Sequence, residues 1–397
     1  MADMARTGRR VQQWQPMFAL PNIRLDEAIE VDGFALAPVT DDRVQEMARN
    51  ERFRSFLGRF TTEFGVPVEP AIIIWRNDKP DTYRTIAAIS GFRDAIAMCV
   101  IPMAWALTLR YQRNMGPLYG DYLSFYPWMI DNQNDHLITR TPLMFGIHEV
   151  KKLRAVTTPA VSPQTISARE LDTPLLKELL ARWERCFATD SPSEEDERLF
   201  RSLNMSHAAS LMPAGVDNKL YDVLRSVALW ASAFEILRPS RREAYRQIYD
   251  LLEGITWNLT DCNQDLYTVF GDPQGTLRKL PVWIYGEITR LRNDTLHGNP
   301  LRPERLIVPP GKQSMVMYAS PLYRMVLAAI LNLTYTPEPP REEQTQYEAY
   351  IRERFEFGRF QRDIEPALAT MLYTDEEQDE RRRIRPRRSA GPPLDAT

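Results

Sequence analysis

The sequence predicts a mainly α-helical protein in which a mixed α+β domain precedes a bundle of helices. Apolar residues recur at helical spacing in one segment after another between residues 170 and 336. The first 165 residues instead alternate short β-branched runs with helical stretches. The 397 residues allow two or three domains, and 44% hydrophobic with 26% charged residues is typical of soluble globular proteins.

The charge and cysteine content excludes several classes of protein. A net charge of −3 gives no overall attraction to nucleic acids or membranes, so any RNA contact must come from local basic patches. Three widely spaced cysteines, Cys99, Cys186 and Cys262, exclude a disulfide framework and a CxxC metal site. The apolar run from Ala95 to Leu109 contains Pro102 and is shorter than a membrane span. We therefore expect a cytoplasmic protein with no membrane segment, bound metal or cofactor.

The first domain, residues 1–165, is assigned to recognition or regulation by elimination. Strands are expected at Ile29–Pro38 and Ala71–Trp75, and helices from Asp41 or Asp42 to Phe60 and from Thr82 to Arg110 with a break at Pro102. His136 and His148 lack metal-ligand spacing and are expected to be structural. An aromatic cluster could stack on bases or pack in the core; it comprises Tyr119, Tyr122, Phe125, Tyr126 and Trp128.

A proline- and threonine-bearing segment, Ala155–Gln164, marks the domain boundary, and helices follow it. Asp172 with Pro174 begins the first of them, and Ser193 begins the second. Asp217 or Asn218 could cap the third. The expected helices are Leu175–Phe187, Ser193–Leu211, Leu220–Leu237, Arg241–Thr256, the helix from Trp283, and Pro321–Leu333.

The stretch from Trp283 to Pro300 is the central feature of the sequence, because it combines an amphipathic helix with a polar cluster at the helix end. Its expected buried stripe consists of Ile284, Ile288, Leu291 and Thr295. Arg292, Asn293 and His297 lie mostly off this stripe, and Gly298 with Pro300 ends the helix. Asn293 and His297 are four residues apart and can share a hydrogen bond. An imidazole near a guanidinium can move a proton and stabilise a charged phosphate.

The segment RNDTLHG resembles the signature of HEPN domains, which are helical bundles and in many cases metal-independent ribonucleases of bacterial toxin and phage-defence systems. The matching residues are Arg292, Asn293, His297 and Gly298. Arg201 and His207 satisfy only the bare spacing of arginine and histidine. Together with WASAFEIL, residues 230–237, the match resembles the ApeA-like branch and covers roughly residues 175–335.

The resemblance implies an endoribonuclease that uses the RNA 2′-hydroxyl, with tRNA among its candidate substrates. Arg292, Asn293 and His297 would be catalytic, and Glu235, Asp294 and Gly298 would support them. Glu235 is expected in a buried helix, where it pairs with Arg292 or His297, or else with Arg238 or Arg242. Arg290, Arg278 and Lys279 are candidates for RNA binding. The resemblance also implies a symmetric homodimer and a phage or protein trigger sensed by the first domain.

Other interpretations remain open. The histidine and glycine could be an ordinary helix C-cap, and the bundle a non-catalytic HEPN-like module that binds nucleotides or proteins. Asp294 could recruit a metal, although it has no partners at suitable spacing. Residues 341–373 are expected to form a charged docking helix interrupted at Gly358 and Pro366. Residues 374–397 have the composition of a disordered basic tail.

Overall fold

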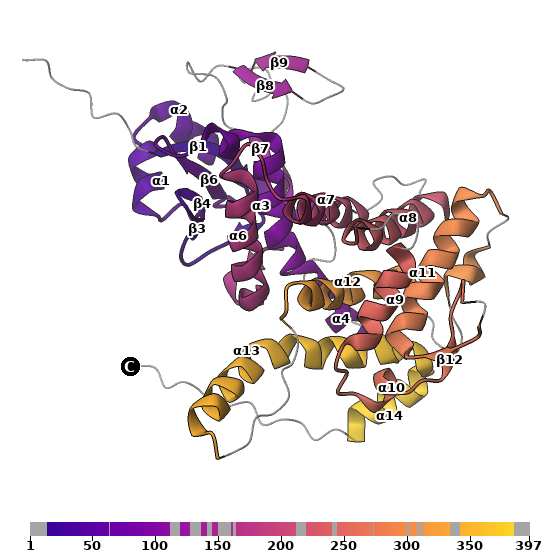
Figure 1. Cartoon of the computed structure of the whole chain (residues 1–397). Coiled ribbons are helices and arrows are strands. Elements are labelled where there is room, and N and C mark those ends of the chain that lie inside the picture. The colour runs from indigo at the N-terminus through magenta and orange to yellow at the C-terminus, as the bar shows by residue number, and fades with distance from the viewer. Residues whose placement is uncertain are drawn as a thin grey trace, which may run out of the picture.

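The computed structural model is mainly helical, with a small sheet in the N-terminal region (Figure 1), as the sequence predicts. Elements and contacts are described for the following residues: 14–62, 64–111, 120–127, 136–140, 145–149, 160–161, 164–211, 220–239, 244–272, 274–299, 302–307, 310, 313–333 and 342–384. The predicted helix caps at Asp217 or Asn218, Tyr119 and Trp128 of the aromatic cluster, and the tail beyond residue 384 lie outside them.

A five-stranded antiparallel sheet forms the N-terminal region. Its order is β3-β4-β6-β1-β7, with bounds Ile29–Val31, Phe34–Ala37, Ala71–Arg76, Trp14–Leu20 and Tyr126–Pro127. The predicted strand at Ala71 is confirmed as the central β6. Ile72 and Ile74 of β6 pack into one apolar cluster while Ile73 and Trp75 pack into another, because successive strand side chains point to opposite faces.

Shorter strands pair outside this sheet. β2 (Ile23–Arg24) pairs with β11 (Ile166–Ser167), β5 (Thr61–Thr62) with β10 (Ala160–Val161), and β8 (His136–Arg140) with β9 (Phe145–Glu149). β8 and β9 carry His136 and His148, whose side chains are outside the described part of the structure. The described aromatics of the predicted cluster pack internally: Phe125 lies 5.0 Å from Phe18, and Tyr126 lies 5.3 Å from Phe60 between ring centroids.

The predicted extents of two elements in this region were wrong. The expected strand Ile29–Pro38 is a hairpin, because Asp32 and Gly33 adopt φ of 42° and 73° and turn the chain. The expected helix to Phe60 is two helices, α1 (Asp42–Met47) and α2 (Glu51–Leu57). Asn50 separates them, since its side chain caps α2 by accepting hydrogen bonds from the backbone N–H groups of Arg52 and Phe53.

The long apolar run forms two helices, α3 (Ile86–Met98) and α4 (Ile101–Tyr111), as a helix pair was expected. The break falls at Cys99 and Val100 rather than at Pro102, because a proline in the first turn of a helix lacks only an N–H that has no partner there. Within the described residues, Ile86–Tyr111 is the single helical segment long and apolar enough to cross a membrane, and 72% of its most apolar window is buried inside the protein.

Helices α6 (Thr173–Phe187) and α7 (Glu194–Ala209) begin where the sequence predicts. The side chains of Asp172 and Ser193 cap them by accepting from Leu175 N and Asp196 N. The chain continues through α8 (Leu220–Ile236), α9 (Ala244–Gly254), the short α10 (Thr260–Asn263), strands β12 (Tyr267–Thr268) and β13 (Leu277–Arg278), α11 (Leu280–Leu296) and α12 (Val316–Ile330). The α12 helix starts earlier than predicted and contains Pro321.

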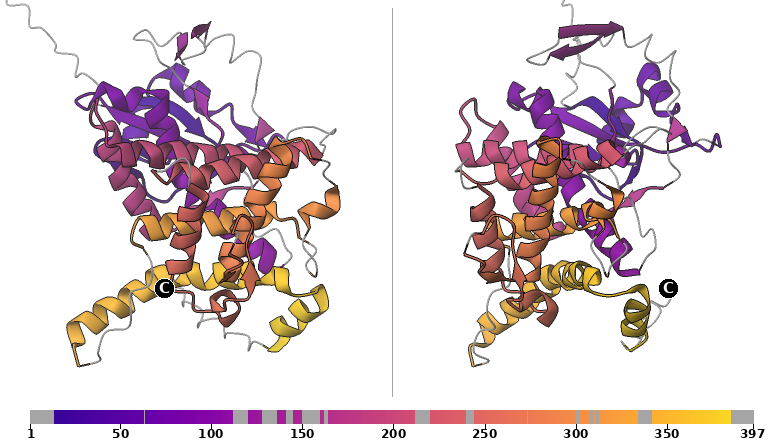
Figure 2. Two further views of the ribbon diagram at one scale, coloured as in Figure 1. Left: turned by 45° about the vertical axis from the view of Figure 1, so that its right-hand side comes forward. Right: turned by 90° about the vertical axis from the view of Figure 1, so that its right-hand side faces the viewer.

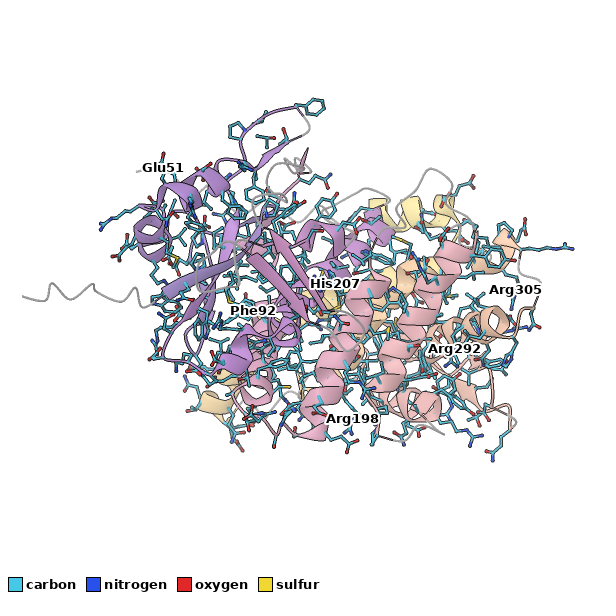
Figure 3. All side chains as sticks on the ribbon, turned by 90° about the horizontal axis from the view of Figure 1, so that it is seen from above. Glu51, Phe92, Arg198, His207, Arg292 and Arg305 are labelled. Atoms are coloured by element: carbon cyan, nitrogen blue, oxygen red, sulfur yellow. The ribbon has the colours of Figure 1, made fainter. Side chains whose placement is uncertain are left out.

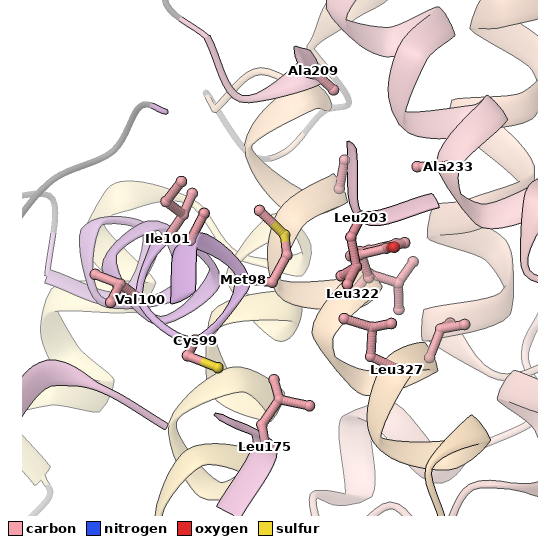
Figure 4. Close-up of a cluster of buried hydrophobic side chains, with 14 of the residues drawn as sticks. Met98, Cys99, Val100, Ile101, Leu175, Leu203, Ala209, Ala233, Leu322 and Leu327 are labelled. Atoms are coloured by element: carbon pink, nitrogen blue, oxygen red, sulfur yellow. The ribbon is translucent and has the colours of Figure 1, made fainter. Parts of the chain in front are cut away.

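A continuous apolar core joins the N-terminal region to these helices. Figure 4 shows Met98 and Cys99 at the junction of α3 and α4 facing Leu175, Leu203 and Leu322, which come from α6, α7 and α12. The predicted boundary near residue 165 therefore does not coincide with a gap in the core.

Asp172 and Arg324 form a buried ion pair at the centre of this assembly. The Arg324 guanidinium donates to one carboxylate oxygen of Asp172 at 2.7 and 2.9 Å, and both side chains are 3% exposed. The backbone N–H of Asp172 also donates to Cys99 O at 2.9 Å. This one residue thus connects the α3–α4 junction, the start of α6 and the middle of α12.

The C-terminal helices α13 (Gln344–Ala369) and α14 (Asp375–Ile384) correct two predictions. Gly358 and Pro366 do not interrupt α13, which is continuous, and the acidic run after Thr374 is helical up to Ile384. Figure 2 shows α13 crossing one end of the bundle. The buried Glu365 of α13 fixes it there, because its carboxylate accepts from the backbone N–H groups of Asn258 and Leu259 at 3.0 and 2.6 Å.

Candidate functional site

The predicted site lies at the C-terminal end of α11, which packs against α8, α9 and α12. Three residues of the predicted stripe, Ile284, Ile288 and Leu291, are buried as expected. Thr295 is only half-buried, and its hydroxyl donates to Leu291 O at 2.8 Å. The apolar face therefore ends about one turn before the helix does, which leaves the last polar residues close to solvent.

The helix ends at Gly298 as predicted. His297 is the C-cap residue, and its backbone N–H donates to Asn293 O at 3.0 Å. Gly298 follows with φ of 68°, a left-handed conformation that glycine adopts without steric cost. The N–H of Asn299 then donates to Asp294 O at 3.0 Å. The end of α11 is thus a fixed backbone structure rather than a frayed turn.

Arg292 pairs with Glu235 across the interface between α11 and α8. Its Nη2 atom lies 3.4 Å from Glu235 Oε2, and its Nη1 atom donates to Asn293 Oδ1 at 3.0 Å. The two charged side chains are 27% and 23% exposed. Burial raises the pKa of Glu235, and the Arg292 charge opposes that rise. Among the partners expected for Glu235, Arg292 is the one that pairs with it in the described residues. Arg242 lies outside the described residues.

Arg292 keeps unused hydrogen-bonding capacity. Its Nε atom is buried without a hydrogen-bond partner, and the ion pair with Glu235 is longer than a good charge-assisted hydrogen bond. A buried unpaired donor costs free energy in a folded protein. The guanidinium is therefore anchored but not saturated; its Nε atom is buried, and the 27% of the side chain that remains exposed offers N–H groups that can donate to a phosphate oxygen.

His297 lies five positions after Arg292, which corresponds to about 140° around the axis of an ideal helix. The His297 side chain is exposed and makes no hydrogen bond or ion pair with the described part of the chain. The expected hydrogen bond between Asn293 and His297 is absent, because the Asn293 side-chain oxygen accepts from Arg292 instead. Within one chain, the described contacts of the Arg292 guanidinium are with Asn293 and Glu235 and do not include the imidazole.

Asp294 stabilises the segment after the helix. Its carboxylate accepts from the Asn299 side-chain amide at 2.9 Å and lies 3.8 Å from the guanidinium of Arg305, which belongs to a short 3-10 helix, Pro303–Leu306. Figure 3 shows Arg292 and Arg305 on the same side of the molecule. Sequence analysis did not single out Arg305. Among the described residues, no three His, Cys, Asp or Glu side chains are grouped to hold a metal ion.

The three candidate RNA-binding residues are divided between the two ends of α11. Arg290 lies near the site, exposed and 3.7 Å from Glu287. Arg278 and Lys279 precede the helix, and the helical rise places Lys279 roughly 27 Å from His297. Lys279 donates to Glu253 O at 2.8 Å, and Arg278 lies 4.0 Å from Asp250. Arg278 and Lys279 therefore interact with acidic residues or backbone oxygens of α9, far from the predicted catalytic residues.

Comparison with protein-family models, curated proteins and solved structures finds no match to this chain. The assignment of function consequently depends on the site itself.

The second arginine–histidine pattern, Arg201 with His207, is structural. His207 is buried at 5% exposure, its Nδ1 atom lies 3.6 Å from the fully buried Asp94, and its Nε2 atom lies 3.3 Å from Gly120 O. Burial, together with the nearby Arg93 charge, lowers the pKa of His207 to about 3. A histidine held neutral and enclosed in this way is not accessible to a substrate such as RNA.

Proposed function

We propose that this protein is a metal-independent endoribonuclease of the HEPN type, with Arg292 and His297 as its catalytic residues. The observation that carries the proposal is the state of the α11 end: an anchored, unsaturated guanidinium and an exposed imidazole within one and a half turns. In this proposal the helices from α6 to α12 are the HEPN-like bundle, and Glu235 is the residue that positions Arg292.

The chemistry follows from the roles of the two groups. His297 accepts the proton of the ribose 2′-hydroxyl, whose oxygen attacks the adjacent phosphorus. The bond from phosphorus to the 5′-oxygen breaks, and that oxygen takes the proton from the imidazolium of His297, giving a 2′,3′-cyclic phosphate and a 5′-hydroxyl and restoring the neutral imidazole. Arg292 offsets the charge of the phosphorane, and Asn293 maintains the guanidinium orientation through its 3.0 Å hydrogen bond.

A second copy of the chain resolves the separation of the two groups. Within one chain the two positions are about 140° apart around the helix axis, so a two-fold dimer that joins two α11 ends would let His297 of one copy act beside Arg292 of the other. Leu296, which is 62% exposed next to His297, supplies apolar surface for such a contact. HEPN ribonucleases resembling this chain typically pair their motifs in this manner.

The biological setting is proposed from the resemblance alone. In this setting the protein is a phage-defence or toxin effector that acts on RNA in the cytoplasm, with tRNA among the candidate substrates. It acts after the N-terminal region senses a trigger. Uncontrolled RNA cleavage harms the host, so restraint before triggering is part of the proposal.

The alternative function is a non-catalytic HEPN-like module that binds nucleotides or proteins. Two observations favour it: Arg292 already has a carboxylate partner, and the His297 imidazole has no orienting partner among the described residues. In that case the protein binds its ligand without cutting RNA.

Product analysis separates these functions. Purified protein is incubated in EDTA with an RNA oligonucleotide and with the same oligonucleotide carrying a 2′-deoxy nucleotide at the cleaved position. The ribonuclease yields a 2′,3′-cyclic phosphate end and leaves the 2′-deoxy substrate intact. Cleavage of both substrates, or 3′-hydroxyl ends, contradicts the mechanism. Because a restrained effector is silent in vitro, the same variants are also assayed in cells for toxicity and phage protection.

A further inference from the structure

A cavity of about 500 Å³ opens beside α11. The helix contributes Trp283, Glu287 and Arg290, and the opposite walls come from Phe270 and Arg305 on two separate segments. Its volume lies within the range of small-molecule pockets, and its lining mixes aromatic and charged side chains as nucleotide sites do.

The aromatic part of this cavity is exposed and held in place. Phe270 is 37% exposed, and the half-buried Trp283 ring packs against Tyr267 in a tilted arrangement, with centroids 5.5 Å apart and an interplanar angle of 33°. The Tyr249 hydroxyl donates to Phe270 O at 2.8 Å. The same segment packs directly on α11, since a Cβ built on Gly286 would lie 3.3 Å from the Tyr249 hydroxyl and 3.5 Å from Phe270 N. The aromatic wall is thus fixed before any ligand binds.

The arginine side chains of the cavity keep N–H groups available as hydrogen-bond donors. Arg290 lies 3.7 Å from Glu287 and Arg305 lies 3.8 Å from Asp294, distances longer than a hydrogen bond. The two arginine side chains are 46% and 41% exposed. Each guanidinium can therefore donate to a phosphate oxygen, and the Glu287 carboxylate can accept from the amino group of a base.

The cavity and His297 lie on one face of α11. Trp283, Arg290 and His297 follow at intervals of seven residues, so the helical repeat keeps them within about 40° of one another. Along the axis, His297 is roughly 10 Å from Arg290 and roughly 21 Å from Trp283 by the helical rise. A single RNA strand lying along this face would cover that distance in a few nucleotides.

We infer that this cavity binds one nucleobase of a single-stranded RNA, a few nucleotides from the position that His297 cleaves. Trp283 and Phe270 stack on the base, and Arg290 and Arg305 bind the flanking phosphates. The cleavage position rests on the ribonuclease function proposed above, whereas the binding of the base does not require catalysis. The site would select unpaired RNA, because a base within a duplex cannot enter the cavity.

Binding is measured by fluorescence anisotropy with full-length His297→Ala protein, which leaves RNA uncut, and a labelled single-stranded RNA. On this background Phe270→Ala and Arg290→Ala are compared with Phe64→Ala and Arg225→Ala, which remove an exposed phenyl and an exposed arginine elsewhere. We expect about tenfold weaker binding for the two cavity variants, the size of one lost base stack, and unchanged binding for the two controls.

Abasic substitution along the RNA identifies the bound base. One abasic position is expected to weaken binding about tenfold in the reference protein and to have no further effect in the Phe270→Ala protein. Equal loss at every position, unchanged binding in both cavity variants, or no binding of single-stranded RNA overturns the inference. RNA cleavage by the wild type that the cavity variants leave unaltered overturns it while the ribonuclease function stands. Cavity-dependent binding, with no cleavage in vitro and no effect of His297→Ala on toxicity or phage protection in cells, supports the cavity and contradicts the ribonuclease.

Discussion

The guanidinium of Arg292 lies 3.4 Å from the carboxylate of Glu235, and this contact joins α11 to α8 directly behind the candidate site. Each charged side chain stabilises the other, because an unpaired charge that is largely buried costs free energy of folding. The pair holds Arg292 in place, whereas the His297 side chain is exposed and has no hydrogen-bond partner among the described residues.

The Arg292–Glu235 pair predicts a coupling in stability. Arg292→Ala leaves Glu235 half-buried without its cation and should lower the free energy of unfolding by about 1–2 kcal/mol. Adding Glu235→Ala should cost less than the two single changes combined, by about 1 kcal/mol. Urea denaturation measures all three variants, with Arg290→Ala as the control on the same helix, expected within about 0.5 kcal/mol of wild type. Strict additivity would show that the contact contributes nothing.

A second prediction concerns the backbone at Gly298. Because φ is 68° there and a Cβ would have open space, Gly298→Ala should cost about 1 kcal/mol of stability from backbone strain alone, and Gly298→Asn less. Gly254→Ala is the matched control, since Gly254 also has open space but ends a helix at ordinary φ. Thermal unfolding should show Gly254→Ala as neutral or slightly stabilising. Equal effects at both glycines would contradict the left-handed conformation.

The buried ion pair of Asp172 and Arg324 makes the third prediction. Arg324→Leu leaves an uncompensated carboxylate in the core and should destabilise the protein by about 3–5 kcal/mol. Arg305→Leu removes an arginine from a more exposed pair and should change stability by no more than about 1 kcal/mol. Chemical denaturation of both variants compares them. A small loss for Arg324→Leu would mean that the pair does not hold α6 to α12.

The fourth prediction is a pH dependence at His207. Its pKa is about 3 in the folded protein, against 6.5 for an ordinary histidine, so the unfolded state binds the proton first as pH falls. The stability that His207 contributes is present above pH 6.5 and declines as pH drops below it, by at most about 1.4 kcal/mol per pH unit. The stability deficit of His207→Gln relative to wild type should therefore shrink between pH 7 and pH 5.

Asp94 contributes a pH dependence of stability of the opposite sign, so its effect has to be distinguished from that of His207. Burial raises the pKa of Asp94 to about 6, so its contribution is present below pH 3.8 and declines as pH rises towards 6. Asp94 is present in both the wild type and His207→Gln, so comparing the two proteins removes most of its effect. Denaturation midpoints at three pH values give the comparison. A deficit that stays constant from pH 7 to pH 5 would contradict the assignment of a neutral His207.

Local signals allowed the helices to be predicted from sequence, and contacts distant in sequence account for the errors. Asp172 and Ser193 cap their helices as expected, because a capping side chain bonds to a backbone N–H only two or three residues away. The turn at Asp32 and Gly33 was missed, since the apolar pattern continues across it. Pro366 was expected to break α13, yet packing of this helix against α4 and α12 maintains it.

The candidate site was predictable in its composition but not in its geometry. The pairing of Glu235 with Arg292 could be expected, because a carboxylate in a buried helix needs a cation. The hydrogen bond that the Asn293 side chain accepts from Arg292 and the cavity lined by Arg305 depend on contacts between side chains and on how the loops after α9 and α11 fold back. No periodic pattern within the motif specifies those positions.

The most direct test of the central claim is cleavage of single-stranded RNA and tRNA by the purified wild type in EDTA, beside folded His297→Ala and Arg292→Ala proteins. His148→Ala and Arg225→Ala serve as controls for the loss of a histidine and an arginine elsewhere. The ribonuclease account predicts that both controls cut as fast as the wild type and that the two site variants cut at least a hundredfold more slowly. If the restrained wild type is silent in vitro, the same order of the variants is expected for toxicity in cells. Cutting that survives in His297→Ala, or that EDTA abolishes, would contradict it.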